Sequence, residues 1–163
     1  MSDNFKEYGQ QVIRNSRTLC NELINRGYKV VTGGTDTHLF SVDLRSVGLN
    51  GSKAEKVLEE ISIAVNKNTC PGDKSALNPS GIRIGTPALT SRNFKEKDIL
   101  VVADFIDRGF KLAIEISKSA KGTTLKDFKE NMHEEVYQNK IKELREQVEN
   151  FASQYPMPGF GEW

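Results

Sequence analysis

A polar, turn-rich stretch at residues 66–92 constrains the fold more than any other part of this sequence. It reads NKNTCPGDKSALNPSGIRIGTPALTSR, so three prolines and three glycines interrupt it. Proline lacks a backbone N–H and glycine loses extra entropy in regular structure, so this stretch cannot form a long helix. Loops held by a rigid scaffold are also where binding and catalytic residues concentrate. We therefore look for the functional site here.

The residues before this stretch predict a helix followed by two strands and a second helix. Apolar side chains recur every three or four positions over residues 5–26, which is typical of an amphipathic helix, and Gly27 would end it. Residues 28–32 and 38–44 are typical of two strands, and their short glycine-rich link predicts that they pair antiparallel. Residues 52–55 have the form of a capping box before the second helix. The β-branched residues in 63–65 then predict a short strand.

The residues from Gly81 onward predict one more strand and three helices. In the Ile82-Arg83-Ile84 triplet, the period of two places both isoleucines on one face and the guanidinium on the other. Asn93 is a candidate cap for a long helix, and Leu125, Phe128 and Met132 indicate a short helix. Residues 137–155 carry the clearest helical pattern of the chain.

This order predicts an α+β fold, an α/β sandwich in which helices pack on a small, mostly antiparallel sheet. The 163 residues fit a single domain. We expect it to consist of a connecting helix at 1–27, the sheet, helix and candidate-site loops at 28–92, and C-terminal helices at 93–163.

Charge and composition exclude several classes of function. The formal net charge of +1 does not indicate nucleic-acid binding, because phosphate recognition normally requires a basic excess. No apolar run approaches the about 20 residues of a membrane span, so we expect no membrane association. Cys20 and Cys70 match neither a disulfide framework nor the spacing of metal ligands, so we expect them to be small apolar fillers and predict no metal site.

Arg83 is the sharpest candidate for a functional residue. A planar guanidinium in the middle of a short strand suits bidentate binding of a carboxylate or a phosphate. The flanking Gly81 and Gly85 would let a ligand come close. The alternative is a structural ion pair with Asp43 or Asp73, and the pattern alone leaves both interpretations open.

Other polar residues have plainer alternatives. The amides of Asn66 and Asn68 suit the edge of a heteroaromatic ring, but asparagine is also common in turns. His38 could act as a general base, although a hydrogen-bonded structural histidine is the favoured interpretation because no nucleophile or carboxylate pairs with it. We expect His133 to face solvent.

Several segments together resemble the serine hydroxymethyltransferase family. They are Thr32-Gly33-Gly34-Thr35-Asp36, Val42-Asp43-Leu44-Arg45, residues 66–73, residues 80–92 and the tail at residues 151–160. The resemblance is to the C-terminal portion of these enzymes, closest to the eukaryotic cytosolic form.

This resemblance implies a function, a fold and a set of binding residues. The family interconverts serine and glycine and passes a one-carbon unit to tetrahydrofolate, with pyridoxal phosphate as cofactor. Its aminotransferase-like fold pairs a large cofactor-binding domain with a smaller C-terminal domain, and its members form homodimers or homotetramers. By resemblance, Arg83 would bind the substrate carboxylate, Asn68 would contact the folate ring, and Ser75, Ala76 and Leu77 would line the folate pocket. A cytoplasmic location is implied, with a mitochondrial one as the alternative.

Two departures from the family pattern bear on activity. Thr37 stands where the family pattern has asparagine, and no T-H-K-T-L-R-G-type motif carries the cofactor lysine. Thr123-Thr124-Leu125-Lys126 imitates that motif but lacks its histidine and its R-G ending. We therefore expect this chain to be part of a longer protein that includes the large domain, and to be inactive alone.

Two other interpretations remain. The first is a stand-alone, non-catalytic binding or interaction module of the same fold. The second is another member of the fold superfamily, such as an aminotransferase, which folate binding would distinguish.

Overall fold

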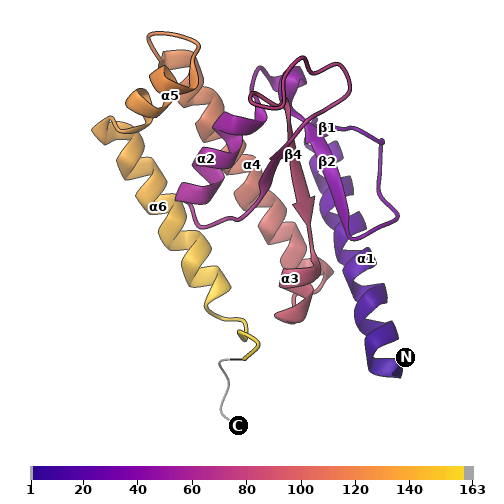
Figure 1. The fold of residues 1–163 in the computed structure, drawn as a ribbon. Helices are drawn as coiled ribbons and strands as arrows, with labels where there is room; N and C mark the ends of the chain where they lie inside the picture. Colours follow the sequence, from indigo (N-terminus) through magenta and orange to yellow (C-terminus); the bar gives the residue numbers. More distant parts are fainter. Residues whose placement is uncertain (1, 160–163) are drawn as a thin grey trace.

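A long helix begins the protein and three further helices end it, with a small sheet between them (Figure 1). The computed structural model describes residues 2–159. Its elements in chain order are α1 (Asp3–Asn25), β1 (Lys29–Val30), β2 (Leu39–Asp43), the 3-10 turn η1 (Leu44–Val47), α2 (Gly51–Glu60), β3 (Asn66–Asn68), β4 (Gly81–Gly85), α3 (Pro87–Ser91), α4 (Glu96–Ser119), α5 (Leu125–Met132) and α6 (Glu135–Ala152). The predicted α+β class is confirmed. Within the same residues, no helix is both long enough and apolar enough to cross a membrane.

The sheet has the strand order β1-β2-β4-β3, and every neighbouring pair is antiparallel. β2 pairs with β4 over five positions, from Leu39 opposite Gly85 to Asp43 opposite Gly81. The short strand β3 covers the other edge of β4, where Asn66 lies opposite Arg83. The strand that carries Arg83 is therefore held on both sides by backbone hydrogen bonds.

The two faces of the sheet differ in chemistry because successive side chains alternate between them. One face is apolar and joins the main core through Phe40, Val42, Ile82 and Ile84, all buried. Helix α4 lies beside the sheet, and α1 and α2 pack against α4 on either side (Figure 1). The opposite face, which we call the open face, carries Ser41, Arg83, Asn66 and Asn68.

Buried polar side chains fix the segment that follows β4. Asn15 of α1 donates from Nδ2 to Thr90 Oγ1 at 3.0 Å and to the Phe94 carbonyl at 2.9 Å. Thr86 Oγ1 donates to the Val12 carbonyl at 2.9 Å. Because burying an unpaired polar group is costly, these bonds define how α1 meets α3 and the start of α4.

The beginning of α2 differs from the prediction. The helix starts at Gly51, and Asn50 is its N-cap, with its side chain accepting from Lys53 N at 3.0 Å. The predicted capping box at residues 52–55 is wrong, because asparagine is an equally good cap and precedes the serine in the chain.

The predicted strand at residues 63–65 is also wrong. Ser62 adopts a left-handed conformation with φ of 64°, and the pairing with β4 begins only at Asn66. Ile63 and Val65 pack against the core without joining the sheet. A β-branched side chain favours a half-buried surface, and packing without pairing satisfies that preference here.

Asn93 does not cap the long helix. It adopts φ of 66°, and α4 begins three residues later, where Asp98 accepts from Lys95 N at 2.9 Å. The short helix α3 occupies residues that we predicted to be loop, and Pro87 starts it. Proline suits the first helical position because its φ is already helical. Asparagine tolerates the left-handed conformation better than most residues, which suits the turn between the two helices.

The remaining helix predictions hold within the described residues. The buried face of α4 contains Ile99, Ile106, Phe110 and Ala113, and α5 is the expected short helix. Phe160, the last residue of the family-like tail, lies outside the described residues.

Candidate functional site

Arg83 lies on the open face, exposed to solvent, between Ser41 on β2 and Asn66 on β3. Both neighbouring isoleucines are buried on the other face, as the alternation predicts. Across residues 2–159, Arg83 takes part in no ion pair and its guanidinium makes no hydrogen bond with protein. An arginine held by a central strand but free at its tip can bind an anionic group that reaches this face.

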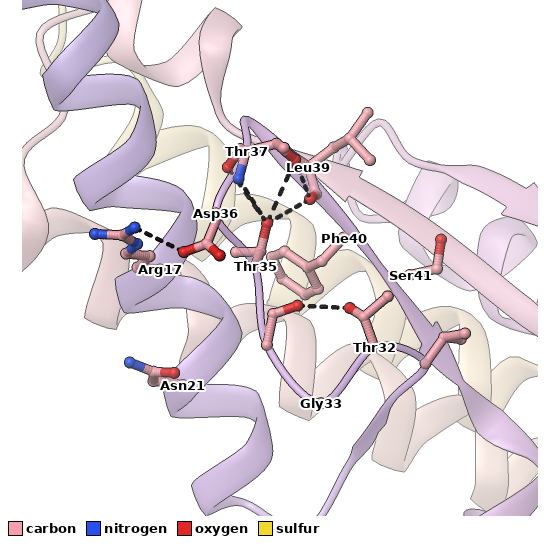
Figure 2. Close-up of a pocket in the computed structure, with 12 residues that line it drawn as sticks. Arg17, Asn21, Thr32, Gly33, Thr35, Asp36, Thr37, Leu39, Phe40 and Ser41 are labelled. Atoms are coloured by element: carbon pink, nitrogen blue, oxygen red, sulfur yellow. Dashed lines mark hydrogen bonds and ion pairs between the residues drawn. The ribbon is translucent and has the colours of Figure 1, made fainter.

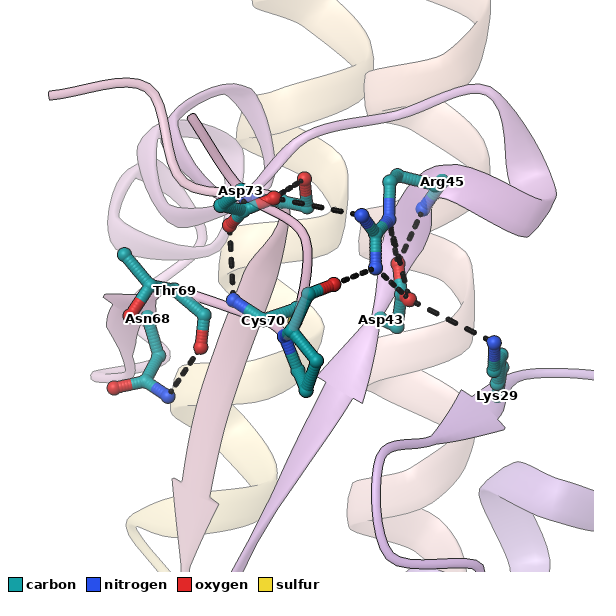
Figure 3. Close-up of polar contacts among 9 residues, drawn as sticks. Lys29, Asp43, Arg45, Asn68, Thr69, Cys70 and Asp73 are labelled. Atoms are coloured by element: carbon teal, nitrogen blue, oxygen red, sulfur yellow. Dashed lines mark hydrogen bonds and ion pairs between the residues drawn. The ribbon is translucent and has the colours of Figure 1, made fainter. Parts of the chain in front are cut away.

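The two carboxylates that could have paired with Arg83 are bound by Arg45 instead (Figure 3). Arg45 donates from Nε to Asp43 Oδ1 at 3.0 Å and from Nη2 to Asp43 Oδ2 at 2.7 Å. Its Nη1 lies 3.6 Å from Asp73 Oδ1. Donation from this guanidinium lowers the pKa of Asp43. The alternative that Arg83 is a structural ion-pair partner of Asp43 or Asp73 is therefore wrong.

Asn68 shares the open face with Arg83, because it lies two residues from Asn66 on β3. It is half-buried, and its Nδ2 donates to the Thr69 carbonyl at 3.1 Å and to Ser41 Oγ at 3.4 Å. The turn interpretation of residues 66–68 is wrong, since they form an edge strand. The side-chain oxygen of Asn68 remains available to a ligand on this face.

Ser75, Ala76 and Leu77 lie elsewhere, at the exposed tip of the loop that joins β3 to β4. Leu77 is 88% exposed, and its backbone N–H donates to Ser75 Oγ at 3.1 Å. The structure thus places Arg83 and Asn68 on one face and leaves these three residues on a solvent-facing loop. An exposed leucine of this kind suits contact with a flat apolar group.

A hollow of about 700 Å³ lies between α1 and residues 31–41, beside the open face (Figure 2). Ser41 lines it and also lies opposite Arg83 in the sheet. Its one arginine, Arg17, pairs with Asp36 at 2.7 Å, and Thr35 Oγ1 donates to the Leu39 carbonyl at 2.8 Å. The sequence did not predict this hollow, although the polar residues from Thr32 to Thr37 were a signal for it. Because Arg17 and Asp36 pair with each other, we expect the hollow to fit a ligand by its shape and not by charge.

Comparisons with known proteins identify relatives of this chain. The family model described as serine hydroxymethyltransferase matches residues 1–106. A serine hydroxymethyltransferase of Bombyx mori is 56% identical over 160 residues, which is 98% of this chain and 34% of that protein. The cytosolic enzyme of Oryctolagus cuniculus is 55% identical over 161 residues, covering 98% of this chain and 33% of that protein. A chloroplastic enzyme of Arabidopsis thaliana is 48% identical over 160 residues, covering 97% and 30% respectively.

The chain belongs to the serine hydroxymethyltransferase family. It spans about a third of the length of the curated relatives it matches, and it corresponds to their C-terminal part.

One lysine of this family member is buried, and it lies among the helices. Lys53 is the only buried lysine among residues 2–159, at 7% exposure, and burial lowers its pKa. Its Nζ donates to Ser117 Oγ at 2.9 Å and lies 5.6 Å from the centre of the Phe128 ring. Lys53 is thus held between α2, α4 and α5, within the helical layer. No local pattern in the sequence indicates its burial.

The histidines and cysteines also take structural or solvent positions. His38 and His133 are both exposed, and no hydrogen bond of the His38 ring occurs within the described part of the chain. The interpretation of His38 as a hydrogen-bonded structural residue is therefore wrong, whereas the solvent-facing His133 is confirmed. Cys20 and Cys70 are buried free thiols, as expected of apolar fillers, and burial raises the pKa of each. Residues 2–159 contain no cluster of three or more His, Cys, Asp or Glu side chains arranged to hold a metal ion.

Proposed function

We propose that this chain is the C-terminal domain of an enzyme that interconverts serine and glycine and transfers a one-carbon unit to tetrahydrofolate. Membership of the serine hydroxymethyltransferase family supports this, together with identity of about half to relatives from insects, mammals and plants. Within this domain we assign residues 1–27 to a connecting helix, 28–92 to the sheet and site loops, and 93–163 to the C-terminal helices.

The free guanidinium of Arg83 carries the proposal. The carboxylate of serine or glycine would receive two parallel N–H···O bonds from it, and each charge-assisted bond contributes about 1.5–3 kcal/mol. Asp43 and Asp73 do not compete for Arg83, because Arg45 binds both of them. The domain would therefore orient the amino acid by its carboxylate.

Folate recognition belongs to the residues beside Arg83. The Asn68 amide offers an acceptor oxygen on the same face, which matches the N–H donors at the edge of a pterin ring. The exposed Ser75, Ala76 and Leu77 would line the pocket when the remainder of the enzyme closes over this face. The two substrates would then meet across β3 and β4.

Pyridoxal phosphate would be held by the large domain outside this chain. The cofactor acts as an electron sink, and it requires a lysine with a lowered pKa that faces the substrate. Lys53 does not fit that requirement, because its amine is bonded to Ser117 within the helical layer. The proposed role of this chain is binding and orientation, so we expect it to be inactive alone.

The location and assembly of the enzyme follow its relatives. We assign it to the cytoplasm, because the rabbit relative is a cytosolic form and is more similar to this chain than the chloroplastic one. A homodimer or homotetramer is the assembly expected of the complete protein.

The test is the substitution Arg83→Lys in the full-length enzyme, with Arg108→Lys on α4 as a matched control. Lysine keeps the charge but loses the planar fork. We expect kcat/KM for serine to fall by about tenfold or more, the factor that corresponds to one lost charge-assisted bond. Arg108 contacts Gln147 on α6, so its substitution should leave this constant near the wild-type value. A normal kcat/KM for Arg83→Lys would overturn the proposal.

A further inference from the structure

A single carboxylate closes both ends of the loop between β3 and β4 (Figure 3). Asp73 Oδ2 accepts from the backbone N–H of Cys70 at 2.9 Å and from that of Ser80 at 2.8 Å. The Ser80 hydroxyl donates to Asp73 Oδ1. The residues just after β3 and just before β4 are thus bound to one side chain, which is only 6% exposed.

Arg45 ties this closed loop to the sheet. Its Nη2 donates to the Pro71 carbonyl at 3.0 Å, while the same guanidinium binds Asp43 at the end of β2. Gly72 turns the chain here with φ of 90°, a conformation that side chains with a Cβ rarely adopt. The base of the loop is therefore bound to β2, which is separated from β3 in the sheet by β4.

The tip of the loop has no such support. Ser75, Ala76 and Leu77 are exposed, and the bond between Leu77 N and Ser75 Oγ is local. Since the tip packs on no core side chain, its position depends on how its base is held. A change at the base would move the tip while leaving the hydrophobic core intact.

We propose that Asp73 is a positioning residue for the folate co-substrate, which it serves by holding the base of the loop so that residues 75–77 face the ligand bound at Asn68. This inference rests on the proposed function, because it takes residues 75–77 as folate contacts. Asp73 itself, nearly buried and engaged by Cys70 and Ser80, would touch no substrate.

The first experiment is hydrogen exchange on the 163-residue chain, comparing the wild type with Asp73→Ala, Asp73→Asn and the control Lys74→Ala. Lys74 is the exposed neighbour of Asp73. We expect the amides of Cys70 and Ser80, which donate to Asp73, to exchange faster in Asp73→Ala and less so in Asp73→Asn, which keeps one acceptor oxygen. The control should match the wild type. Unchanged exchange in Asp73→Ala would overturn the proposal that Asp73 holds the base of the loop.

The second experiment measures steady-state kinetics of the same variants in the full-length enzyme. We expect Asp73→Ala to raise KM for tetrahydrofolate by about tenfold while KM for serine stays within about twofold, with partial rescue in Asp73→Asn. A merely structural role would raise both constants together, and that result would overturn the proposal. So would faster exchange with a normal KM for tetrahydrofolate. Failure of the proposed function would be detected separately, because Arg83→Lys would then have a normal kcat/KM for serine. Should Asp73→Ala fail to fold, Asp73→Asn decides both measurements.

Discussion

Two arginines in this domain have opposite roles because of where the backbone places them. Arg83 lies at the middle of a central strand, so its side chain must leave the sheet on the face opposite to Ile82 and Ile84. Arg45 lies in the turn after β2, within reach of carboxylates from the strand end and the loop. The guanidinium of Arg45 is bound to carboxylates of the domain, whereas that of Arg83 remains available to a ligand.

The Asp73 carboxylate should make stability depend on acid. Donation from the Ser80 hydroxyl and from the N–H groups of Cys70 and Ser80 lowers its pKa to about 2. Its contribution to the free energy of unfolding is complete above the unfolded pKa of about 3.9, and it is lost as the pH falls through the folded value. The urea midpoints of the wild type and Asp73→Asn should therefore differ by a constant amount above about pH 5 and converge toward about pH 2. A difference that persists unchanged at the lowest pH would contradict this assignment.

The sequence predicts the direction of Arg83 but not which residues bind the carboxylate of Asp73. The Ile-Arg-Ile triplet was enough to predict the direction of Arg83, because alternation in a strand is a local property. The ion pair between Arg45 and Asp73 and the bonds from Ser80 to Asp73 depend on how the loop between β3 and β4 folds back, which no local pattern encodes. The burial of Lys53 has the same origin, since it results from the packing of α2 on α4 and α5.

The contact between α2 and the start of β4 positions the site loop at the level of whole elements. A Cβ at Gly51 would lie 2.1 Å from the Gly81 carbonyl oxygen and 3.0 Å from that of Pro79. Gly51 N also donates to the Pro79 carbonyl at 2.8 Å. The first turn of α2 therefore lies directly against the backbone that leads into β4.

Two glycine-to-alanine substitutions should act in opposite directions. Gly51→Ala forces a backbone shift, so we expect it to reduce the free energy of unfolding by about 1–3 kcal/mol. Gly9 lies in α1, and a methyl group added at its Cα would meet no neighbouring atom within 4 Å, so Gly9→Ala should add up to about 1 kcal/mol. Urea unfolding of both variants checks the pair. A neutral Gly51→Ala would mean that α2 and β4 are not in close contact.

The helices were easier to predict than the strands for a physical reason. The buried faces of α1, α4 and α6 each extend over many turns, so their periodicity is unambiguous. β1 and β3 contain two and three residues, too few to show a period, and β3 exists because the edge of β4 supplies its partners. β1 and β3 are therefore strands because they pair with residues distant in the sequence.

At the scale of the whole molecule, the first turns of α1 leave a large apolar side chain exposed. Phe5 is 55% exposed at the start of α1, although Val12 on the same helix is buried. The helical periodicity of residues 5–26 predicts that Phe5, Tyr8 and Val12 share a buried face, but only Val12 is buried, while Tyr8 is half-buried and Phe5 is exposed. An apolar groove lined by Phe5, Tyr8 and Pro87 continues this surface.

The chain alone should not form a specific adduct with pyridoxal phosphate. Its buried lysine, Lys53, is bonded to Ser117, and the others among residues 2–159 are exposed or half-buried. After borohydride reduction, mass spectrometry should find sparse labelling at many lysines, whereas the full-length enzyme should carry one label at one lysine. One equivalent on a single lysine of the isolated chain would contradict the assignment of the cofactor to the large domain.

The class of the fold could be predicted from the order of its elements, but the strand order could not. The sequence indicates that β1 and β2 are neighbours because a short link joins them. It does not indicate that β4 inserts between β2 and β3, since that arrangement follows from which strand buries both isoleucines against the helices. This insertion is what brings Arg83 between Ser41 and Asn66.

The most direct measurement is a crystal structure of the full-length enzyme with glycine or serine bound. We expect two nitrogen–oxygen contacts of about 2.7–2.9 Å between the Arg83 guanidinium and the amino-acid carboxylate. We also expect Arg45 to bind Asp43 in that complex. A substrate carboxylate bound by other residues, with Arg83 left in solvent or paired with a protein carboxylate, would contradict the assignment of Arg83.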